Sequence, residues 1–83
     1  MADDPKRVAL SLTPNQKNGL RFLAARKGQD ARVHIYTLHR HTANALLNRN
    51  LAAHERNERG EYVIWATDFG RAVASHLSDW VAA

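Results

Sequence analysis

The spacing of apolar positions changes along this chain, and the change predicts the order of its elements. Apolar residues alternate over positions 8–12, which favours a short strand or an extended segment, and residues 1–7 are expected to form a flexible N-terminal arm. The run Thr-Pro-Asn-Gln at 13–16 has the composition of a capping box with proline at the first helical position. A helix is therefore predicted over residues 14–26, with Gly28 as its stop signal.

The second half of the chain predicts a strand, a helix, a hairpin and a last helix. Residues 32–35 favour a short strand, and a helix is expected from about 36 to 49, with Asn50 as a residue that tolerates the left-handed conformation at its end. Residues 51–67 contain two strand-like stretches around a turn cluster, which predicts a β-hairpin. Apolar residues at intervals of three and four over 68–81 predict the last helix.

This order of elements defines the expected fold class. A chain of 83 residues is long enough for one domain. We expect an α+β domain over residues 8–83, with three or four helices and a β-sheet of two or three strands that includes the hairpin.

Three stretches resemble the winged-helix family, especially its small bacterial and phage members of the MarR-like type. Residues 12–16, Leu-Thr-Pro-Asn-Gln, resemble the start of the first helix, and residues 42–51 resemble a recognition helix that leads into the wing. Residues 66–72 resemble the Leu-Thr-x-x-Gly-Arg-Ala pattern that follows the wing, although this chain has Ala66 in place of leucine. The resemblance implies a small winged-helix protein that binds DNA and acts as a transcriptional regulator.

Two features depart from the family pattern. The segment 28–50 is short for two helices, so it holds either one helix or a cramped pair broken near His39. The expected wing is also acidic, with Glu55, Glu58 and Glu61 beside two arginines, and carboxylates repel phosphate.

The charge distribution favours a polyanionic partner. The net charge is +4, and nine of the 12 Lys and Arg residues but only one of the eight acidic residues fall within positions 6–54. A concentrated basic segment is typical of nucleic-acid binding, so double-stranded DNA is the expected partner.

The second helix presents the residue types that read DNA bases. Asparagine and arginine make paired hydrogen bonds with adenine and guanine edges, and threonine and histidine contact bases or phosphates. The expected groove-facing residues, spaced along one helical face with Arg40 at its edge, are Thr37, Arg40, His41, Asn44 and Asn48. Basic residues on the first helix, the strand and the wing are expected to contact phosphates: Lys17, Arg21, Arg32, Arg56 and Arg59.

Two other partners are consistent with the sequence. The acidic wing and an expected exposed Leu47 favour a winged-helix module that binds a protein instead of DNA. A homodimer is the second alternative, with Phe22, Trp80 and Val81 at its interface, because two-fold symmetry presents two reading helices to a palindromic site.

Catalytic, metal and membrane functions find little support in the residues. The chain has no cysteine and no glycine-rich phosphate loop, and on a helix His39 and His41 point about 200° apart, which is poor for shared ligation. We therefore expect no cofactor, no metal site and no enzymatic activity. No apolar run approaches the length of a membrane span. The lack of cysteine fits a reducing compartment, so a cytoplasmic location is expected, with the nucleoid as the site of action if DNA is the partner.

Overall fold

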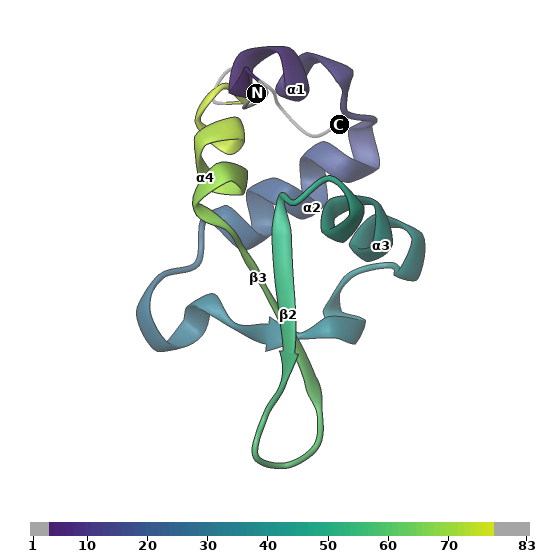
Figure 1. Ribbon diagram of the computed structural model, residues 1–83, viewed down its shortest axis with the longest axis vertical. Helices are drawn as coiled ribbons and strands as arrows, with labels where there is room; N and C mark the ends of the chain where they lie inside the picture. The colour runs from purple at the N-terminus through teal and green to yellow at the C-terminus, as the bar shows by residue number, and fades with distance from the viewer. Residues whose placement is uncertain (1–3, 78–83) are drawn as a thin grey trace.

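The computed structural model describes residues 4–77, except for the side chains of residues 29 and 30. Within this range the chain forms four α-helices, two short 3₁₀ helices and a three-stranded antiparallel sheet (Figure 1). The elements in chain order are α1 (Pro5–Ser11), α2 (Pro14–Ala24), η1 (Gly28–Ala31), β1 (Val33–His34), η2 (Ile35–Thr37), α3 (Arg40–Asn48), β2 (Ala52–Arg56), β3 (Tyr62–Ala66) and α4 (Asp68–Ser75). The predicted α+β class, with three or four helices and a hairpin after the central helix, is confirmed.

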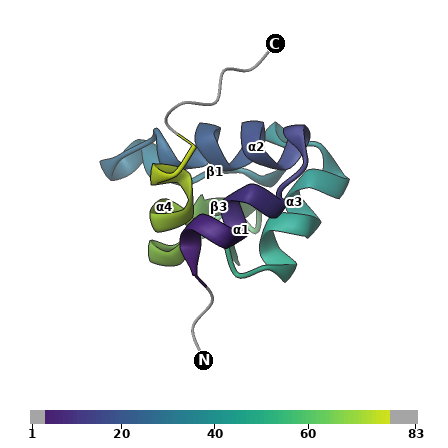
Figure 2. The same ribbon diagram turned by 90° about the horizontal axis from the view of Figure 1, so that it is seen from above.

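The helices gather at one end of the molecule and the hairpin extends from the other. The strand order is β1-β3-β2, so β3 lies in the middle of the sheet and pairs with both neighbours. Seen from above, α3 and α4 lie on opposite sides, with α1 and α2 between them (Figure 2). The β2–β3 turn projects away from all four helices (Figure 1).

One apolar core joins the helices to the sheet. The largest side chains with no exposed surface come from α2, α3, the α3–β2 junction, β3 and α4: Leu20, Leu23, Leu46, Leu51, Ile64 and Val73. Truncation of such a side chain to alanine costs about 2–5 kcal/mol, because it removes buried apolar surface and leaves a cavity. The core therefore fixes the position of α3 relative to the hairpin. None of the helices within residues 4–77 has the length and hydropathy to cross a membrane.

The strand expected at residues 8–12 is wrong, because residues 8–11 belong to helix α1 and Leu12 is its C-cap. The side chain of Asp4 accepts a hydrogen bond from the Lys6 N–H at 3.1 Å and caps the helix, and the predicted boundary after residue 7 falls inside it. Val8 and Leu12 are four residues apart, so the same apolar positions also fit one face of a helix. That face packs against α4, which leaves Leu10 exposed.

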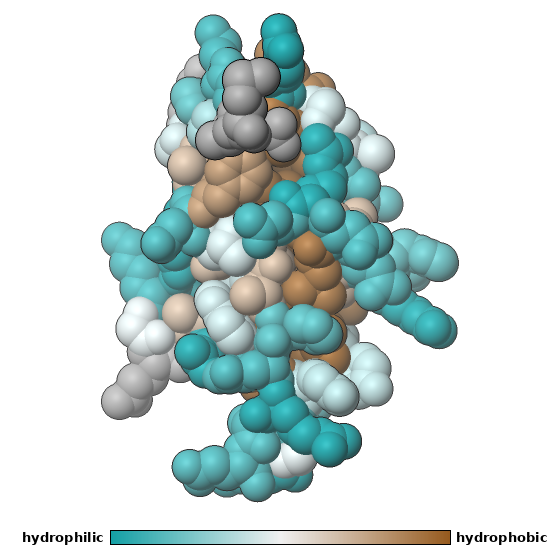
Figure 3. All heavy atoms as spheres, viewed as in Figure 1, coloured by the Kyte–Doolittle hydropathy of each residue, from teal (hydrophilic) through white to brown (hydrophobic). Residues whose placement is uncertain are grey.

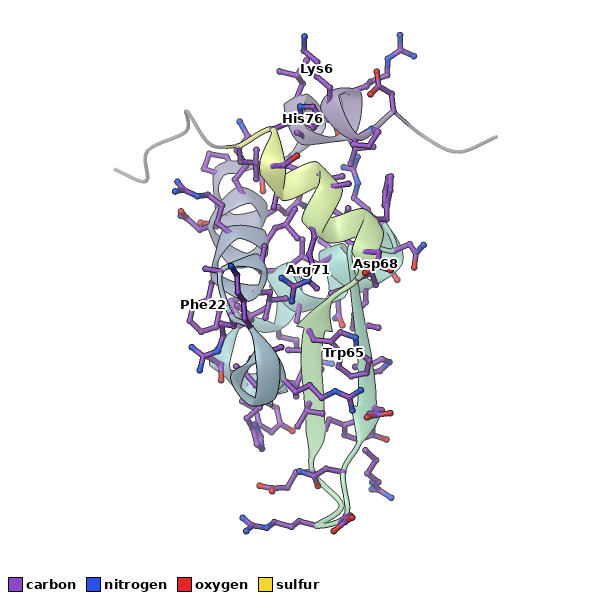
Figure 4. All side chains as sticks on the ribbon, turned by 90° about the vertical axis from the view of Figure 1, so that its left-hand side faces the viewer. Lys6, Phe22, Trp65, Asp68, Arg71 and His76 are labelled. Carbon is purple, nitrogen blue, oxygen red and sulfur yellow. The ribbon has the colours of Figure 1, made fainter. Side chains whose placement is uncertain are left out.

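Helix α2 starts as predicted and ends earlier. Both hydrogen bonds of the capping box are present between Thr13 and Gln16, each at 3.2 Å. The helix ends at Ala24, two residues before the expected end. There the Arg71 guanidinium of α4 donates to the carbonyls of Ala24, at 2.9 Å, and Arg26, at 3.2 Å, and so satisfies the helix end (Figure 4).

The segment between α2 and the hairpin contains one α-helix. The predicted helix over 36–49 is broken at residues 38–39: η2 comes first, and α3 begins after His39. Asn50 ends α3 with φ of 61°, which confirms its expected role. The Leu51 N–H donates to the Leu46 carbonyl at 2.9 Å and the Asn50 N–H donates to the Leu47 carbonyl at 3.1 Å, which is the Schellman pattern.

The start of α4 lies directly against the end of α3. Thr67 caps α4 through its hydroxyl, which accepts from the Gly70 N–H at 2.9 Å and donates to the Asn50 carbonyl at 2.8 Å. A Cβ at Gly70 would overlap the carbonyl group of Leu51, so only glycine fits. This close approach explains a glycine inside the first turn of a helix, where it otherwise costs about 1 kcal/mol relative to alanine.

We expect Gly70→Ala to destabilise the protein by about 2–3 kcal/mol, because the added methyl group forces backbone apart at the α3–β2–α4 junction. Urea unfolding followed by circular dichroism measures the change. Helix propensity alone would make the alanine variant more stable than the parent. A variant that is as stable as the parent, or more stable, would therefore contradict the close contact.

Candidate nucleic-acid interface

The polar side of α3 is exposed to solvent. Ala43 and Leu46 are buried on the inner side of the helix, which packs against α2 and β2. The polar residues on its outer side are all exposed: Arg40, His41, Asn44 and Asn48. At 100° per residue, these four positions span an arc of about 100°. The predicted reading helix therefore presents four of its five predicted side chains on one continuous face.

Thr37 and Leu47 differ from their expected positions. Thr37 is exposed but belongs to η2, so it does not continue the face of α3. Leu47 is half-buried and packs against the core. The expectation of an exposed Leu47, which favoured a protein partner, is therefore wrong.

A groove of about 440 Å³ lies between α3, η2 and the hairpin. Ile35, Leu38 and Ala43 give it an apolar floor, and the polar and aromatic residues that line it are Tyr36, Arg40, Asn44, His54 and Tyr62. In the space-filling view a hydrophobic strip is visible beside β2, surrounded by hydrophilic surface (Figure 3). Among the described residues that line the groove none is acidic.

The strand alternation places basic and aromatic residues of the hairpin on the groove side. His54 of β2 has the buried Ile64 as its Cα partner, and Arg56 has Tyr62 as its partner, so these positions share one face of the sheet. The His54 and Tyr62 rings are stacked with centroids 5.8 Å apart. The Arg56 guanidinium carbon lies 5.4 Å from the centroid of the Tyr62 ring. Arg56 is a predicted phosphate contact, whereas His54, Tyr62 and Tyr36 are not predicted from the sequence as site residues.

The opposite face of the hairpin holds two of the three glutamates of the expected wing. Glu55 forms an ion pair with Arg32, whose guanidinium carbon lies 4.2 Å from the ring centroid of Trp65. Glu61 lies 3.6 Å from the His34 imidazole. Figure 4 shows Trp65 on the hairpin. Glu55 and Glu61 therefore face away from the groove, whereas Glu58 lines a hollow at the end of the hairpin that Arg56 also lines.

The remaining predicted phosphate contacts lie elsewhere. Arg21 lines a separate hollow between α2 and α4, together with Arg71. Lys17 lies one turn before Arg21 on the same side of α2, whereas Gly19 on the opposite side faces α3. Arg59 lies in the hairpin turn, where its N–H donates to the Asn57 side chain at 2.9 Å. The structure brings none of these three residues to the groove.

The expected dimer residues are only partly described. Phe22 is 37% exposed on α2, and the Arg26 guanidinium carbon lies 5.4 Å from its ring centroid. Trp80 and Val81 lie outside the described residues.

Two histidines cap the elements that form the groove. The His34 Nδ1 accepts from the Tyr36 N–H at 3.3 Å, and the His39 Nδ1 accepts from the His41 N–H at 3.2 Å at the start of α3. The His39 and His41 rings lie 5.3 Å apart, but residues 4–77 contain no group of three His, Asp or Glu side chains that is placed to hold a metal ion. Through these two capping hydrogen bonds, His34 and His39 fix the starts of η2 and α3.

We expect His39→Ala to destabilise the protein by about 1 kcal/mol, because α3 loses its N-cap acceptor. His41→Ala is the matched control: it removes the neighbouring exposed ring but leaves the cap, and surface substitutions of this kind change stability by about 0.5 kcal/mol or less. Thermal unfolding of both variants measures the difference. Equal losses would contradict the capping role.

Comparisons with protein-family models, with curated proteins and with solved structures give no match for this chain. The class defined by the structure is a small α+β domain in which helices precede an antiparallel β-hairpin, with a last helix after it. The function must therefore be argued from the groove and the surfaces beside it.

Proposed function

We propose that this protein is a winged-helix DNA-binding protein in which α3 enters the major groove and the β2–β3 hairpin is the wing. The observation that carries the proposal is the shared groove: Arg40 and Asn44 of α3 line it together with His54 and Tyr62 of the hairpin, and no carboxylate lies among its described lining residues. In this reading the 3₁₀ helix η2 stands where family members have the first helix of the helix-turn-helix.

The side chains on α3 suit base recognition. Asn44 and Arg40 are exposed, lie one helical turn apart and line the groove together. An asparagine amide pairs with an adenine edge, and an arginine guanidinium pairs with a guanine edge. His41 and Asn48 extend the same face along the helix and are suited to flanking bases or phosphates.

The charge on the hairpin supports contact with the DNA backbone on its groove side. Arg56 projects on that side, whereas Glu55 and Glu61 lie on the other face beside Arg32 and His34. Arg56 is therefore the hairpin cation that is best placed to contact a phosphate on the α3 side, although it also lines a hollow with Glu55 and Glu58. Regulation of transcription is the role that such binding would serve.

We expect the affinity for fluorescent duplex DNA to fall with salt, with a log–log slope of about −4 or steeper, because several phosphates are neutralised. Arg56→Ala should make the slope less steep by about 1, since one phosphate contact is lost. Lys6→Ala is the matched control, because it removes one positive charge from α1 at the end of the molecule opposite the hairpin (Figure 4). Fluorescence anisotropy over a series of salt concentrations measures each slope.

Two results would contradict the proposal. Absence of duplex binding at about 50 mM salt, where phosphate contacts are strong, would remove DNA as the partner. Equal effects of Arg56→Ala and Lys6→Ala would mean that net charge, and not the hairpin surface, determines binding.

We expect Asn44→Ala to lose about 1–3 kcal/mol of discrimination at a single base pair of the preferred site, because the amide reads one base edge. The preferred site is first selected from a pool of random duplexes, and the variant is then tested against each single-base change. A uniform loss over all sequences would show that Asn44 contacts the backbone and does not read a base.

A further inference from the structure

The groove beside α3 contains aromatic rings that duplex recognition does not use. Tyr36 is 86% exposed and Tyr62 is 46% exposed, and both line the groove with His54. The Tyr62 ring is stacked on His54 and has the Arg56 guanidinium near it, so the more exposed Tyr36 is the ring that is accessible to a ligand. The groove therefore has an apolar floor, aromatic side chains along it and a lining cation, Arg40.

An intact duplex offers little to such a groove. Paired bases present only their edges in the major groove, because their faces are stacked on one another. An aromatic side chain gains stacking energy only from a base that has left the stack, as in a single strand or at a frayed end. Every base has such a face, so contacts of this kind tolerate different sequences.

We propose that the groove binds an unpaired base of a single-stranded segment that adjoins the duplex held by α3. Tyr36 stacks against the base, and Ile35 and Leu38 lie beneath it. Arg56, which lies near Tyr62, binds a flanking phosphate. This inference rests on the proposed DNA binding and names the form of DNA that the site prefers: a junction between double and single strands.

Charge favours a nucleic acid over a peptide as the occupant of the groove. The lining carries Arg40, with Arg56 beside Tyr62, and no described lining residue is acidic, so the site suits an anion that also has a flat apolar face. A nucleotide has both properties in one unit, because its phosphate and its base are adjacent.

The test compares three DNAs of one sequence: a blunt duplex, the same duplex with a five-nucleotide single-stranded overhang, and the single strand alone. We expect the overhang to bind at least about 5-fold more tightly than the blunt duplex, since one stacked base supplies an effect of that size. Tyr36→Ala should remove this gain, measured as the ratio of overhang to blunt-duplex affinity for the same variant, whereas Tyr36→Phe should retain it. Leu10→Ala is the control, because it removes an equally accessible apolar side chain from α1.

A fluorescent base analogue, 2-aminopurine, in the overhang gives a second readout that does not depend on affinity. Its emission should fall on binding to the parent protein and to Tyr36→Phe, and should change less with Tyr36→Ala, because stacking quenches it. The inference is overturned if the blunt duplex binds as tightly as the overhang, or if Tyr36→Ala matches the parent in both readouts. In either case binding to the blunt duplex leaves the proposed function standing, whereas failure of all three DNAs to bind overturns both.

Discussion

The close contact between the backbone of Leu51 and the start of α4 at Gly70 positions the rest of the site. Asn50 in the left-handed conformation ends α3, and Leu51 turns the chain into β2. Gly70 allows α4 to lie against this turn, and Thr67 bonds to both sides of it. Because α3, the hairpin and α4 meet at this junction, a shift there would change the angle between the helix and the hairpin, and with it the groove.

The hairpin shows how strand alternation separates opposite charges that are adjacent in sequence. Glu55 and Arg56 are neighbours, but they project on opposite faces of β2, and only Arg56 lies on the side of α3. Glu55 is then compensated by Arg32, which lies over Trp65 of the same face. Exposed ion pairs of this kind add little stability. Their main consequence is that the negative charge of Glu55 lies on the face of the hairpin away from α3.

Local signals predicted most of the fold, and tertiary contacts determined the rest. The capping box at Thr13 and the left-handed stop at Asn50 act within a few residues, so the sequence was enough to place them. The alternation at residues 8–12 fits a strand and a helix equally, and the helix is the form that packs against α4. For the candidate site, the face of α3 followed from helical spacing, but the groove depends on which elements lie side by side, and Tyr36 carries no local signal.

The exposed groove residues contribute little to folding, so their substitution tests their contribution to binding. A side chain that is 86% exposed, such as Tyr36, buries too little surface to stabilise the fold appreciably. A large aromatic ring exposed to water buries little apolar surface unless a partner covers it. Leu46 and Ile64, by contrast, are fully buried beneath the same region and carry the packing that holds α3 against the sheet. The core thus sets the geometry of the site, and substitution of an exposed ring such as Tyr36 is expected to change binding more than stability.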